Sequence, residues 1–486
     1  MMIRPTLEEA RQYNNGDYKV IPISMEILSD FITPIQALRV LKNVSDHCYM
    51  LESAAADEMW GRYSFLGYNP TLEITGVDHI MKIGDRMFIT DNPSDEIRRI
   101  LAEHKSPKMP YLPSFSGGLV GYFAYDYLKY AEKSLRMDAE DTENFKDVDL
   151  MLFDKVIAFD HVRQRIILIQ NIRLEHLEKE YDRAVEELRG MADLLHHGTP
   201  KQEADGKLTS EVTALFDREN YCRMVERAKY HIKEGDIFQI VLSNRLEADY
   251  EGSLLHAYRI LRASNPSPYM FYFSGLDVEV AGASPETLVK LEDGVLHTFP
   301  LAGTRPRGKT QEEDVRLEQE LLADEKERAE HNMLVDLGRN DIGKISRFGT
   351  VEVERYMDIL RFSHVMHIGS TVRGIIDDSH DALDTIEAIL PAGTLSGAPK
   401  IKACQLINDL ENNKRGIYGG AIGYIDFTGN LDTCIAIRIA YKKNGKVFVR
   451  SGAGIVADSV PENEYRECIN KAAAVVEALK KKEEDL

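Results

Sequence analysis

Tight turns between runs of β-forming residues near the end of the chain constrain its fold most strongly. Gly429-Asn430 and Asn444-Gly445 separate the segments GAIGYIDF, DTCIAIRIAY and KVFVRSGA. Gly-Asn and Asn-Gly pairs between β-rich segments are typical of antiparallel hairpins, because both residues accept the left-handed backbone that such turns require. The pattern therefore predicts that each segment forms one strand of an antiparallel sheet.

Further strands and helices are predicted on both sides of a polar stretch in the middle of the chain. TLEITGV, HIMKIG and RMFIT predict a meander, and KVIAFDH and RIILIQN predict two more strands. The stretch at 196–211 lies between two predicted helices and has no periodic apolar pattern, which is typical of a linker. We therefore expect an α+β fold of antiparallel sheets packed with helices, with an N-terminal domain over 1–200 and a C-terminal domain over 212–486.

Composition excludes several classes of partner. The 486 residues carry a formal net charge of −20, so there is no basic excess to neutralise the phosphates of a nucleic acid or an anionic membrane. The sequence has neither a signal-peptide pattern at its N-terminus nor a run of about 20 apolar residues. Its five cysteines are scattered without a C-x-x-C pair, which favours a reducing compartment. We expect a cytoplasmic protein that binds neither nucleic acid nor membrane.

The segment GTRPRGKT at 303–310 matches the phosphate-loop pattern G-x-x-x-x-G-K-[ST]. A phosphate loop needs a parallel sheet and a row of backbone N–H donors, but Pro306 removes one donor inside the loop. The following segment, QEEDVRLEQELL, is acidic where a helix would meet the phosphates. The surroundings therefore argue against a nucleotide site, and against a Mg²⁺-dependent phosphoryl-transfer enzyme.

Two pairs of glutamates are candidates for a metal site. Glu327 and Glu330 lie three residues apart in one predicted helix, and Glu464 and Glu467 lie three apart in another, so each pair shares a helix face. Either pair alone also fits an ordinary solvated surface with neighbouring basic residues. If the helices pack together, four carboxylates converge and need a cation. A site of oxygen ligands alone favours Mg²⁺.

The chain resembles the chorismate-utilising enzymes, and among them the component I subunits of anthranilate synthases. The resemblance is thinner in the N-terminal half, through MLESA, GRYSFLG and SFSGGLVGYFAYD. It is dense after residue 215, through DIFQIVLSNR, NPSPYMFYF, GASPETLV, PLAGTRPRG, KERAEHNMLVDLGRNDIG, VMHIGSTV, PAGTLSGAPK, GIYGGAIGY, CIAIR, SGAGIVADS and ENEYRECINK. It implies a lyase that converts chorismate and ammonia to anthranilate and pyruvate in tryptophan biosynthesis.

The resemblance also implies roles for individual residues. Glu330 and Glu467 are expected to bind Mg²⁺ directly, with Glu327 and Glu464 supporting through water. Glu286 is expected to be the general acid that protonates the departing hydroxyl, and His367 to act in the loss of pyruvate. The residues expected to bind the substrate are Gly303, Thr304, Gly393, Thr394, Tyr418, Arg438, Gly452, Ala453, Gly454 and Lys471.

Two positions discriminate between members of this family. Members that add water carry a lysine base where this chain has Gln239, so ammonia is the expected nucleophile. Aminodeoxychorismate synthases have a nucleophilic lysine where this chain has Ala302, which cannot attack covalently. An anthranilate-forming enzyme is therefore expected, with the aminodeoxychorismate synthases as the alternative. A catalytically silent ligand-sensing module would lack parts of the site.

Regulation and a partner are further expectations from the resemblance. None of the cysteines sits in the context of a glutaminase nucleophile, so ammonia is expected from solution or from a separate glutamine amidotransferase subunit in a hetero-oligomer. A tryptophan feedback pocket is expected between the two halves of the chain. Its expected residues are Leu51, Glu52, Ser53, Asn265, Pro268, Tyr269 and Met270.

Overall fold

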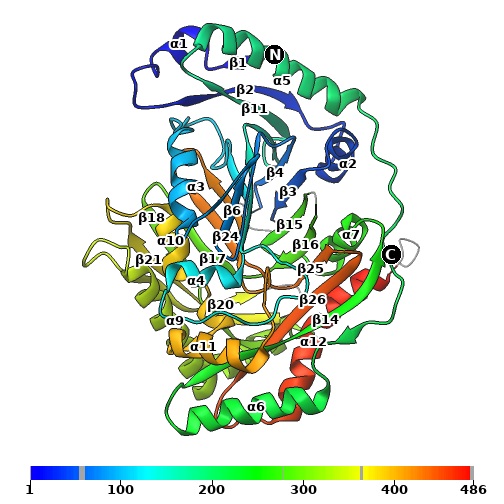
Figure 1. The fold of residues 1–486 in the computed structure, drawn as a ribbon, viewed down its shortest axis with the longest axis vertical. Helices are drawn as coiled ribbons and strands as arrows, with labels where there is room; N and C mark the ends of the chain where they lie inside the picture. The colour runs from blue at the N-terminus through cyan, green and yellow to red at the C-terminus, as the bar shows by residue number, and fades with distance from the viewer. Residues whose placement is uncertain (1, 54–60, 276, 362–364, 482–486) are drawn as a thin grey trace.

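The computed structural model describes residues 2–53, 61–275, 277–361 and 365–481 of the chain. Its strands form two large antiparallel sheets, with helices around them (Figure 1). This arrangement confirms the predicted α+β class. No helix in the described part of the chain is long and apolar enough to span a bilayer.

The first sheet has 14 strands and combines both ends of the sequence. Its main path runs in the order β1 (Ile3–Arg4), β2 (Val20–Leu28), β11 (Arg165–Arg173), β10 (Lys155–Asp160), β4 (Tyr63–Tyr68), β3 (Cys48–Glu52), β15 (Tyr269–Ser274), β16 (Glu279–Ser284), β25 (Ile439–Lys443), β26 (Lys446–Ile455), β14 (Gln239–Glu251) and β12 (Lys207–Leu208). Two short strands also pair with β14, namely β13 (Thr213–Ala214) and β22 (Gly397–Ala398).

The second sheet has 12 strands and is likewise assembled from both halves. Its path is β19 (Leu301–Pro306), β21 (Val365–Ile375), β18 (Val295–Thr298), β17 (Thr287–Glu292), β24 (Leu431–Ile435), β23 (Ala421–Asp426), β8 (Gly118–Phe123), β9 (Val148–Phe153), β5 (Leu72–Val77), β6 (Ile80–Ile83) and β7 (Arg86–Ile89). Strand β20 (Glu352–Arg361) pairs with β21 beside this path. Because strands from both sides of 196–211 share each sheet, the predicted division into domains at this stretch stays a prediction.

The helices surround the two sheets. They are α1 (Leu7–Arg11), α2 (Pro34–Val44), α3 (Pro93–Ala102), α4 (Leu128–Ala131), α5 (Leu177–His197), α6 (Arg218–Lys233), α7 (Leu255–Ser264), α8 (Gln311–Ala323), α9 (Glu325–Gly343), α10 (Ala382–Ile389), α11 (Lys400–Glu411) and α12 (Pro461–Lys480), with the 3₁₀ turns η1 (Tyr125–Tyr127) and η2 (Gly393–Leu395). Figure 1 shows α5 at the end of the molecule that holds the N-terminus and α6 at the opposite end, with α12 running from α6 towards the C-terminus.

The core is divided into layers by the sheets. One apolar cluster lies between the sheets and includes Tyr49 and Phe271 of the first sheet and Val120 and Ile422 of the second. Other clusters join the first sheet to α2, α5, α7 and α12, and the second sheet to α3, α9 and α10. The order of layers is therefore helix, sheet, sheet, helix, which buries both faces of each sheet.

The predicted C-terminal hairpins are confirmed in part. Asn444 and Gly445 both have positive φ, at 53° and 76°, and join β25 to β26 as a two-residue turn. The segment DTCIAIRIAY, predicted as one strand, is divided between two sheets: β24 ends at Ile435 and β25 begins at Ile439. A continuous β-rich sequence does not reveal this break, because residues on either side of it are equally apolar.

The chain passes between the sheets a second time close to this break. Strand β16 of the first sheet ends at Ser284, and β17 of the second begins at Thr287. The backbone N–H of Ala283 donates to the Arg438 carbonyl at 3.1 Å, and the N–H of Ile435 donates to the Glu286 carbonyl at 3.0 Å. The two passages between the sheets therefore lie side by side.

The segment GTRPRGKT is not part of a phosphate loop. It begins in β19, which pairs antiparallel with β21, and ends at the start of α8. The backbone N–H of Gly308 donates to Asp314 at 2.7 Å, and that of Lys309 donates to Glu313 at 2.8 Å. Carboxylates of α8 therefore occupy donors that a phosphate would need. Hydrogen bonds from Arg307 and Gly308 lower the pKa of Asp314 to about 2.

Candidate active site

The two passages between the sheets carry Glu286 and Arg438, which the sequence placed in the substrate site. Burial raises the pKa of Glu286 to about 7, against the opposing effects of a hydrogen bond from Thr394 and the charges of Arg438 and Lys471. The Thr394 hydroxyl donates to Glu286 Oε1 at 3.1 Å. A carboxyl with this pKa holds its proton near neutral pH and has the properties of a general acid.

Arg438 is held in an uncommon backbone conformation. Its φ is +53°, in the left-handed region that side chains other than glycine rarely adopt. Burial lowers the pKa of its guanidinium, and the charge of Glu286 opposes that shift. A partly buried cation on a strained backbone indicates a functional constraint, because neither feature helps the fold.

His367 lies on β21, opposite Thr304 of β19. Its Nδ1 is 2.9 Å from the Gly303 carbonyl oxygen and 3.1 Å from Thr304 Oγ1. Burial and the charge of Arg438 lower its pKa, so the ring is neutral at neutral pH. The carbonyl contact places the proton on Nδ1 and leaves Nε2 as the basic nitrogen. His364, which the sequence did not assign to the site, lies outside the described residues.

Strands β14 and β26 bring the predicted anion-binding glycines beside Gln239 and Tyr418. A Cβ on Gly452 would lie 3.0 Å from the Tyr418 hydroxyl, and one on Gly454 would lie 3.1 Å from Gln239 Nε2. Ala453 between them is fully buried, and Val241 on β14 pairs with Gly454. At Gly452 a Cβ would also lie 2.8 Å from the Leu242 backbone carbonyl oxygen, so a larger residue does not fit there without a backbone shift. At Gly454 only the Gln239 amide would have to move.

Helix α12 fixes Lys471 and Glu467 beside this strand. Lys471 Nζ forms an ion pair with Glu467 Oε1 at 2.7 Å and donates to the Gly452 carbonyl oxygen at 3.2 Å. The Ser451 hydroxyl donates to the Cys468 carbonyl oxygen at 2.6 Å, which holds the helix against β26. Lys471 and Gly452, both predicted to bind the substrate, are therefore in direct contact.

The glutamates of α9 and α12 lie near enough to repel one another. Burial is the largest cause that raises the pKa of Glu330, and the charges of Glu327 and Glu467 raise it further. Burial and the charge of Glu467 likewise raise the pKa of Glu464. Glu327 also faces Arg305, whose Nη1 is 3.6 Å from Glu327 Oε1.

These carboxylates do not form a compact cage. Within the described ranges, no three His, Cys, Asp or Glu side chains are grouped so that they could hold a metal ion. Mg²⁺ commonly uses only one or two protein carboxylates and completes its coordination with water and substrate oxygens. Glu330 and Glu467 would supply such a pair. The donor atoms therefore fit Mg²⁺, which does not need a third protein ligand.

The turn η2 carries Gly393 and Thr394 to Glu286. A cavity of about 50 Å³ is bordered by these residues together with Thr298, Asp341 and other residues of the second sheet, α9 and α10. Asp341 is buried and pairs with Lys400 at 2.6 Å, so its charge is already neutralised within the fold.

The residues predicted to bind tryptophan also come together, at a second cavity. Strands β3 and β15 pair, with Met270 opposite Glu52. A cavity of about 120 Å³ beside them is lined by Leu51, Glu52, Ser53, Pro268, Tyr269 and Met270, among others. The Glu52 carboxylate accepts hydrogen bonds from Tyr258 at 2.5 Å and Arg262 at 2.6 Å. Asn265, at the end of α7, does not line this cavity.

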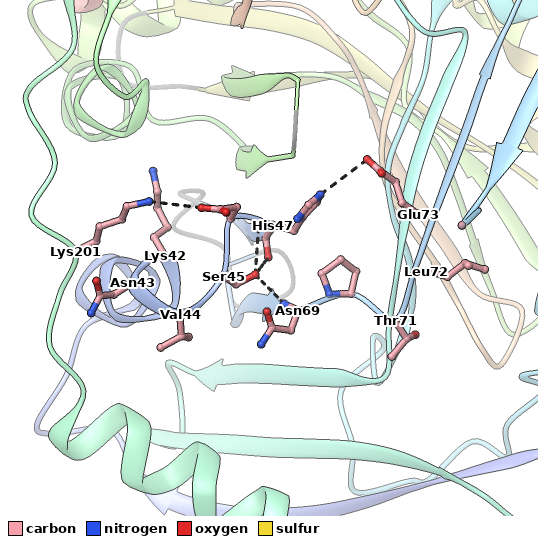
Figure 2. A pocket seen from close by; sticks show the side chains of 13 residues that line it. Lys42, Asn43, Val44, Ser45, His47, Asn69, Thr71, Leu72, Glu73 and Lys201 are labelled. Atoms are coloured by element: carbon pink, nitrogen blue, oxygen red, sulfur yellow. Dashed lines mark hydrogen bonds and ion pairs between the residues drawn. The ribbon is translucent and has the colours of Figure 1, made fainter. Parts of the chain in front are cut away.

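A larger cavity of about 640 Å³ lies elsewhere, between the end of α2 and the 69–73 segment (Figure 2). Its charged groups largely face one another: His47 Nε2 is 4.0 Å from Glu73, and Lys201 Nζ is 3.9 Å from Asp46. None of the predicted catalytic, substrate or metal residues lines it.

Sequence reasoning missed the buried residues that support the site. Arg415, at 1% exposure, donates to backbone carbonyls of η2 and β14. Its only signal in the sequence is its position beside the GIYGG motif, and a basic residue in a loop is ordinarily solvated. A contact with two distant carbonyl groups has no local pattern.

Comparisons with known proteins identify the family of the chain. The family model for the chorismate binding enzyme matches residues 46–477. The chain is 45% identical to anthranilate synthase component 1 of Acetivibrio thermocellus over 98% of this chain and 99% of the relative, and 43% identical to that of Aquifex aeolicus over 100% and 99%.

Solved structures have the same fold. Anthranilate synthase component I from Streptococcus pneumoniae superposes with a TM-score of 0.75 at 37% identity, covering 92% of this chain and 98% of that one. The menaquinone-specific isochorismate synthase of Escherichia coli gives 0.71 at 20% identity, covering 98% and 99%, which supports the fold alone. The chain therefore belongs to the chorismate binding enzyme family, in the group of anthranilate synthase component 1 proteins.

Proposed function

We propose that the protein converts chorismate and ammonia to anthranilate and pyruvate, in a Mg²⁺-dependent reaction of tryptophan biosynthesis. The observation that carries this proposal is the meeting of a protonated carboxyl, Glu286, with the cations Arg438 and Lys471 beside a glycine-rich strand. Such a site suits a dianionic substrate that must lose a hydroxyl group. The names of the most similar relatives support the same reaction.

In the first step, ammonia adds to the ring at C2 while the C4 hydroxyl leaves as water with a proton from Glu286. Arg438, Tyr418 and the backbone N–H groups of 452–454 bind the carboxylate of the enolpyruvyl arm. In the second step, the C2 proton and the enolpyruvyl group depart, which restores an aromatic ring and releases pyruvate. The neutral ring of His367, with Nε2 as its basic nitrogen, assists this second step.

Gln239 and Ala302 support this branch of the family over its alternatives. Gln239 is buried beside Gly454, and its amide has no basic nitrogen to activate water. Ala302 lies on β19 next to Gly303 and Thr304, where a lysine would reach the substrate. The chain therefore has neither the base of a water-adding enzyme nor the nucleophile of an aminodeoxychorismate synthase, which remains the alternative.

Mg²⁺ would be held by Glu330 and Glu467, with Glu327 and Glu464 acting through water. The mutual repulsion of these groups supports a cation at this place, because a divalent ion would relieve it. When bound there, Mg²⁺ would supply positive charge for the ring carboxylate. The Gly393–Thr394 turn would help to hold that carboxylate.

We further propose that a glutamine amidotransferase subunit supplies the ammonia and that both act in the cytoplasm. The name component 1 of the relatives supports a partner component. All five cysteines are free thiols and four are buried, which suits a reducing compartment and leaves no glutaminase nucleophile. Tryptophan is proposed to bind at the cavity beside β3 and β15 and to inhibit the enzyme.

The reaction itself is tested by its products. The purified chain with chorismate, Mg²⁺ and ammonium at alkaline pH should form anthranilate and pyruvate, because free NH₃ is then appreciable. Glutamine should replace ammonium only after the amidotransferase subunit is added. Chromatography and anthranilate fluorescence measure the products of both the ammonium-dependent and the glutamine-dependent reaction. Aminodeoxychorismate as the main product would assign the chain to the alternative, and glutamine use by the chain alone would contradict the proposed partner.

The role of Glu286 is tested by pH. Because its folded pKa is raised to about 7, the acid form is present below that pH and is lost as pH rises through it. The kcat/KM for chorismate, expressed against free NH₃, should therefore fall above about pH 7. Glu286→Gln should lower kcat by about 100- to 10,000-fold. A flat profile between pH 6 and 9 would exclude Glu286 as the acid.

The metal ligands are tested by glutamine substitutions. Glu330→Gln and Glu467→Gln should each lower kcat by about 100-fold or more, because each removes a Mg²⁺ ligand. Since the raised pKa of Glu330 means that its charge destabilises the fold above that pKa, Glu330→Gln should unfold at an equal or higher temperature at pH 7.5 without metal.

A control for the metal-ligand substitutions lies on α12, the helix that carries Glu467. Glu462 is in the first turn of α12 and pairs with Arg218 at 3.5 Å on the surface. Glu462→Gln should leave kcat and Mg²⁺ binding by calorimetry unchanged. Near-normal activity of Glu330→Gln or Glu467→Gln at low Mg²⁺ would show that the ligand assignment is wrong.

The effector cavity is tested by calorimetry with tryptophan in the micromolar range. Ser53→Ala, or a larger side chain at Met270, should relieve inhibition with little change in the uninhibited rate. Linkage requires that chorismate with Mg²⁺ weaken tryptophan binding by the same factor by which tryptophan weakens chorismate binding. If tryptophan bound at the metal site instead, Glu330→Gln would abolish its binding and Ser53→Ala would not.

A further inference from the structure

A cluster of buried charges lies directly behind the candidate site. Glu411, Arg415 and Arg450 are each at most 2% exposed. Glu411 pairs with Arg415 at 2.6 Å and with Arg450 at 2.9 Å. Two cations share one carboxylate, so the cluster keeps one positive charge in excess. Buried ions are costly to maintain, and replacing them with apolar residues is often neutral or stabilising, so stability alone does not account for the cluster.

The two arginines have different partners apart from Glu411. Arg415 Nη1 donates to the Leu395 carbonyl oxygen at 2.6 Å, and its Nη2 donates to the Val241 carbonyl oxygen at 2.8 Å. Arg450 instead donates to Asn413 Oδ1 at 2.9 Å and to Ser243 Oγ at 2.8 Å. Only Arg415 therefore contacts the turn η2.

The partners of Arg415 are the backbone supports of two site elements. Leu395 is the last residue of η2 and follows Thr394, which donates to Glu286. Val241 follows Gln239 by two residues on β14, and its N–H donates to the Ser396 carbonyl oxygen at 2.9 Å. The Arg415 guanidinium also lies over the ring of Tyr418, 5.9 Å from its centroid.

We propose that Arg415 is a positioning residue that holds the η2 turn against β14, so that Thr394 meets Glu286 and the substrate. Its planar fork binds two carbonyl groups that no shorter or single-point donor spans together. This inference rests on the proposed function, in which Glu286 is the acid. Loss of the fork would release Leu395 from β14, so that only residues after the turn, Ser396 and β22, would still bond to that strand. Thr394 would then separate from Glu286.

Loss of the Arg415 fork should change the pKa of Glu286, which loss of a purely structural contact would not do. The Thr394 hydrogen bond lowers the pKa of Glu286, as do the charges of Arg438 and Lys471 that face it. When Thr394 moves away, the carboxyl should hold its proton to a higher pH. The pH at which activity is lost on the alkaline side of the pH–rate profile should therefore increase, although the maximal rate falls.

The test compares Arg415→Lys with Arg450→Lys. Both variants keep a positive charge beside Glu411 and lose the fork, so both should lose thermal stability. Arg415→Lys should lower kcat with ammonium by about 10- to 100-fold, because misplaced groups lose that much in orientation. It should also raise the apparent pKa of the alkaline limb by roughly 0.5 to 1 pH unit, which is the effect of losing one hydrogen bond. Arg450→Lys should change kcat by less than about threefold and leave the limb in place.

A third variant separates the remaining outcomes. Thr394→Val removes the hydroxyl and leaves Arg415 in place, so it should raise the apparent pKa of the alkaline limb to the same extent. The double variant Arg415→Lys/Thr394→Val should raise it no further. An unmoved limb in Thr394→Val overturns the proposal even if Arg415→Lys does not fold. Equal losses of kcat in the two lysine variants, with no shift in either, also overturn it. Wild-type protein that forms no anthranilate would instead contradict the proposed function.

Discussion

The backbone hydrogen bonds between the two passages from sheet to sheet are the constraint on which the site depends. Ala283 donates to the carbonyl of Arg438, and Ile435 donates to the carbonyl of Glu286, so each passage is fixed by the other. The Ser284 hydroxyl adds a bond to the Ile435 carbonyl oxygen at 2.7 Å. Because the sheets pack face to face with a large apolar core between them, neither passage can move without disturbing both layers. An acid and a cation are thereby held on rigid backbone.

Charge is distributed locally in a way that the net charge of −20 conceals. Arg438 and Lys471 face Glu286, and the excess positive charge of the Glu411–Arg415–Arg450 cluster lies behind the same strands. The acidic side chains of α9 and α12 stand opposite, where they repel one another. In a site of low dielectric these contributions are stronger than at the surface. The surroundings of Glu286 are thus locally cationic although the whole molecule is acidic.

Local sequence predicted some elements well and others badly, for identifiable reasons. Asn444-Gly445 predicted its hairpin correctly, because the turn depends on the backbone preferences of those two residues. DTCIAIRIAY was predicted as one strand, because nothing in its composition marks the positive φ at Arg438. GTRPRGKT matched a phosphate-loop pattern. The proline within it and the acidic helix after it were the features that argued against a phosphate loop. In the structure, Asp314 and Glu313 of α8 accept hydrogen bonds from the backbone N–H groups of Gly308 and Lys309.

The sequence by itself determined the α+β class and the family, and it named the groups that are proposed to carry the chemistry. Residue types and their spacing are enough for these, since hairpin turns, helix faces and ordered motifs are local properties. Tertiary structure alone decided which groups meet. The pKa of Glu286 depends on burial, on Thr394 from 108 residues away and on the opposing charges of Arg438 and Lys471. The role of Arg415 depends on carbonyl groups of η2 and β14. Such properties arise from desolvation and from contacts between distant segments, and no local pattern of residues encodes them.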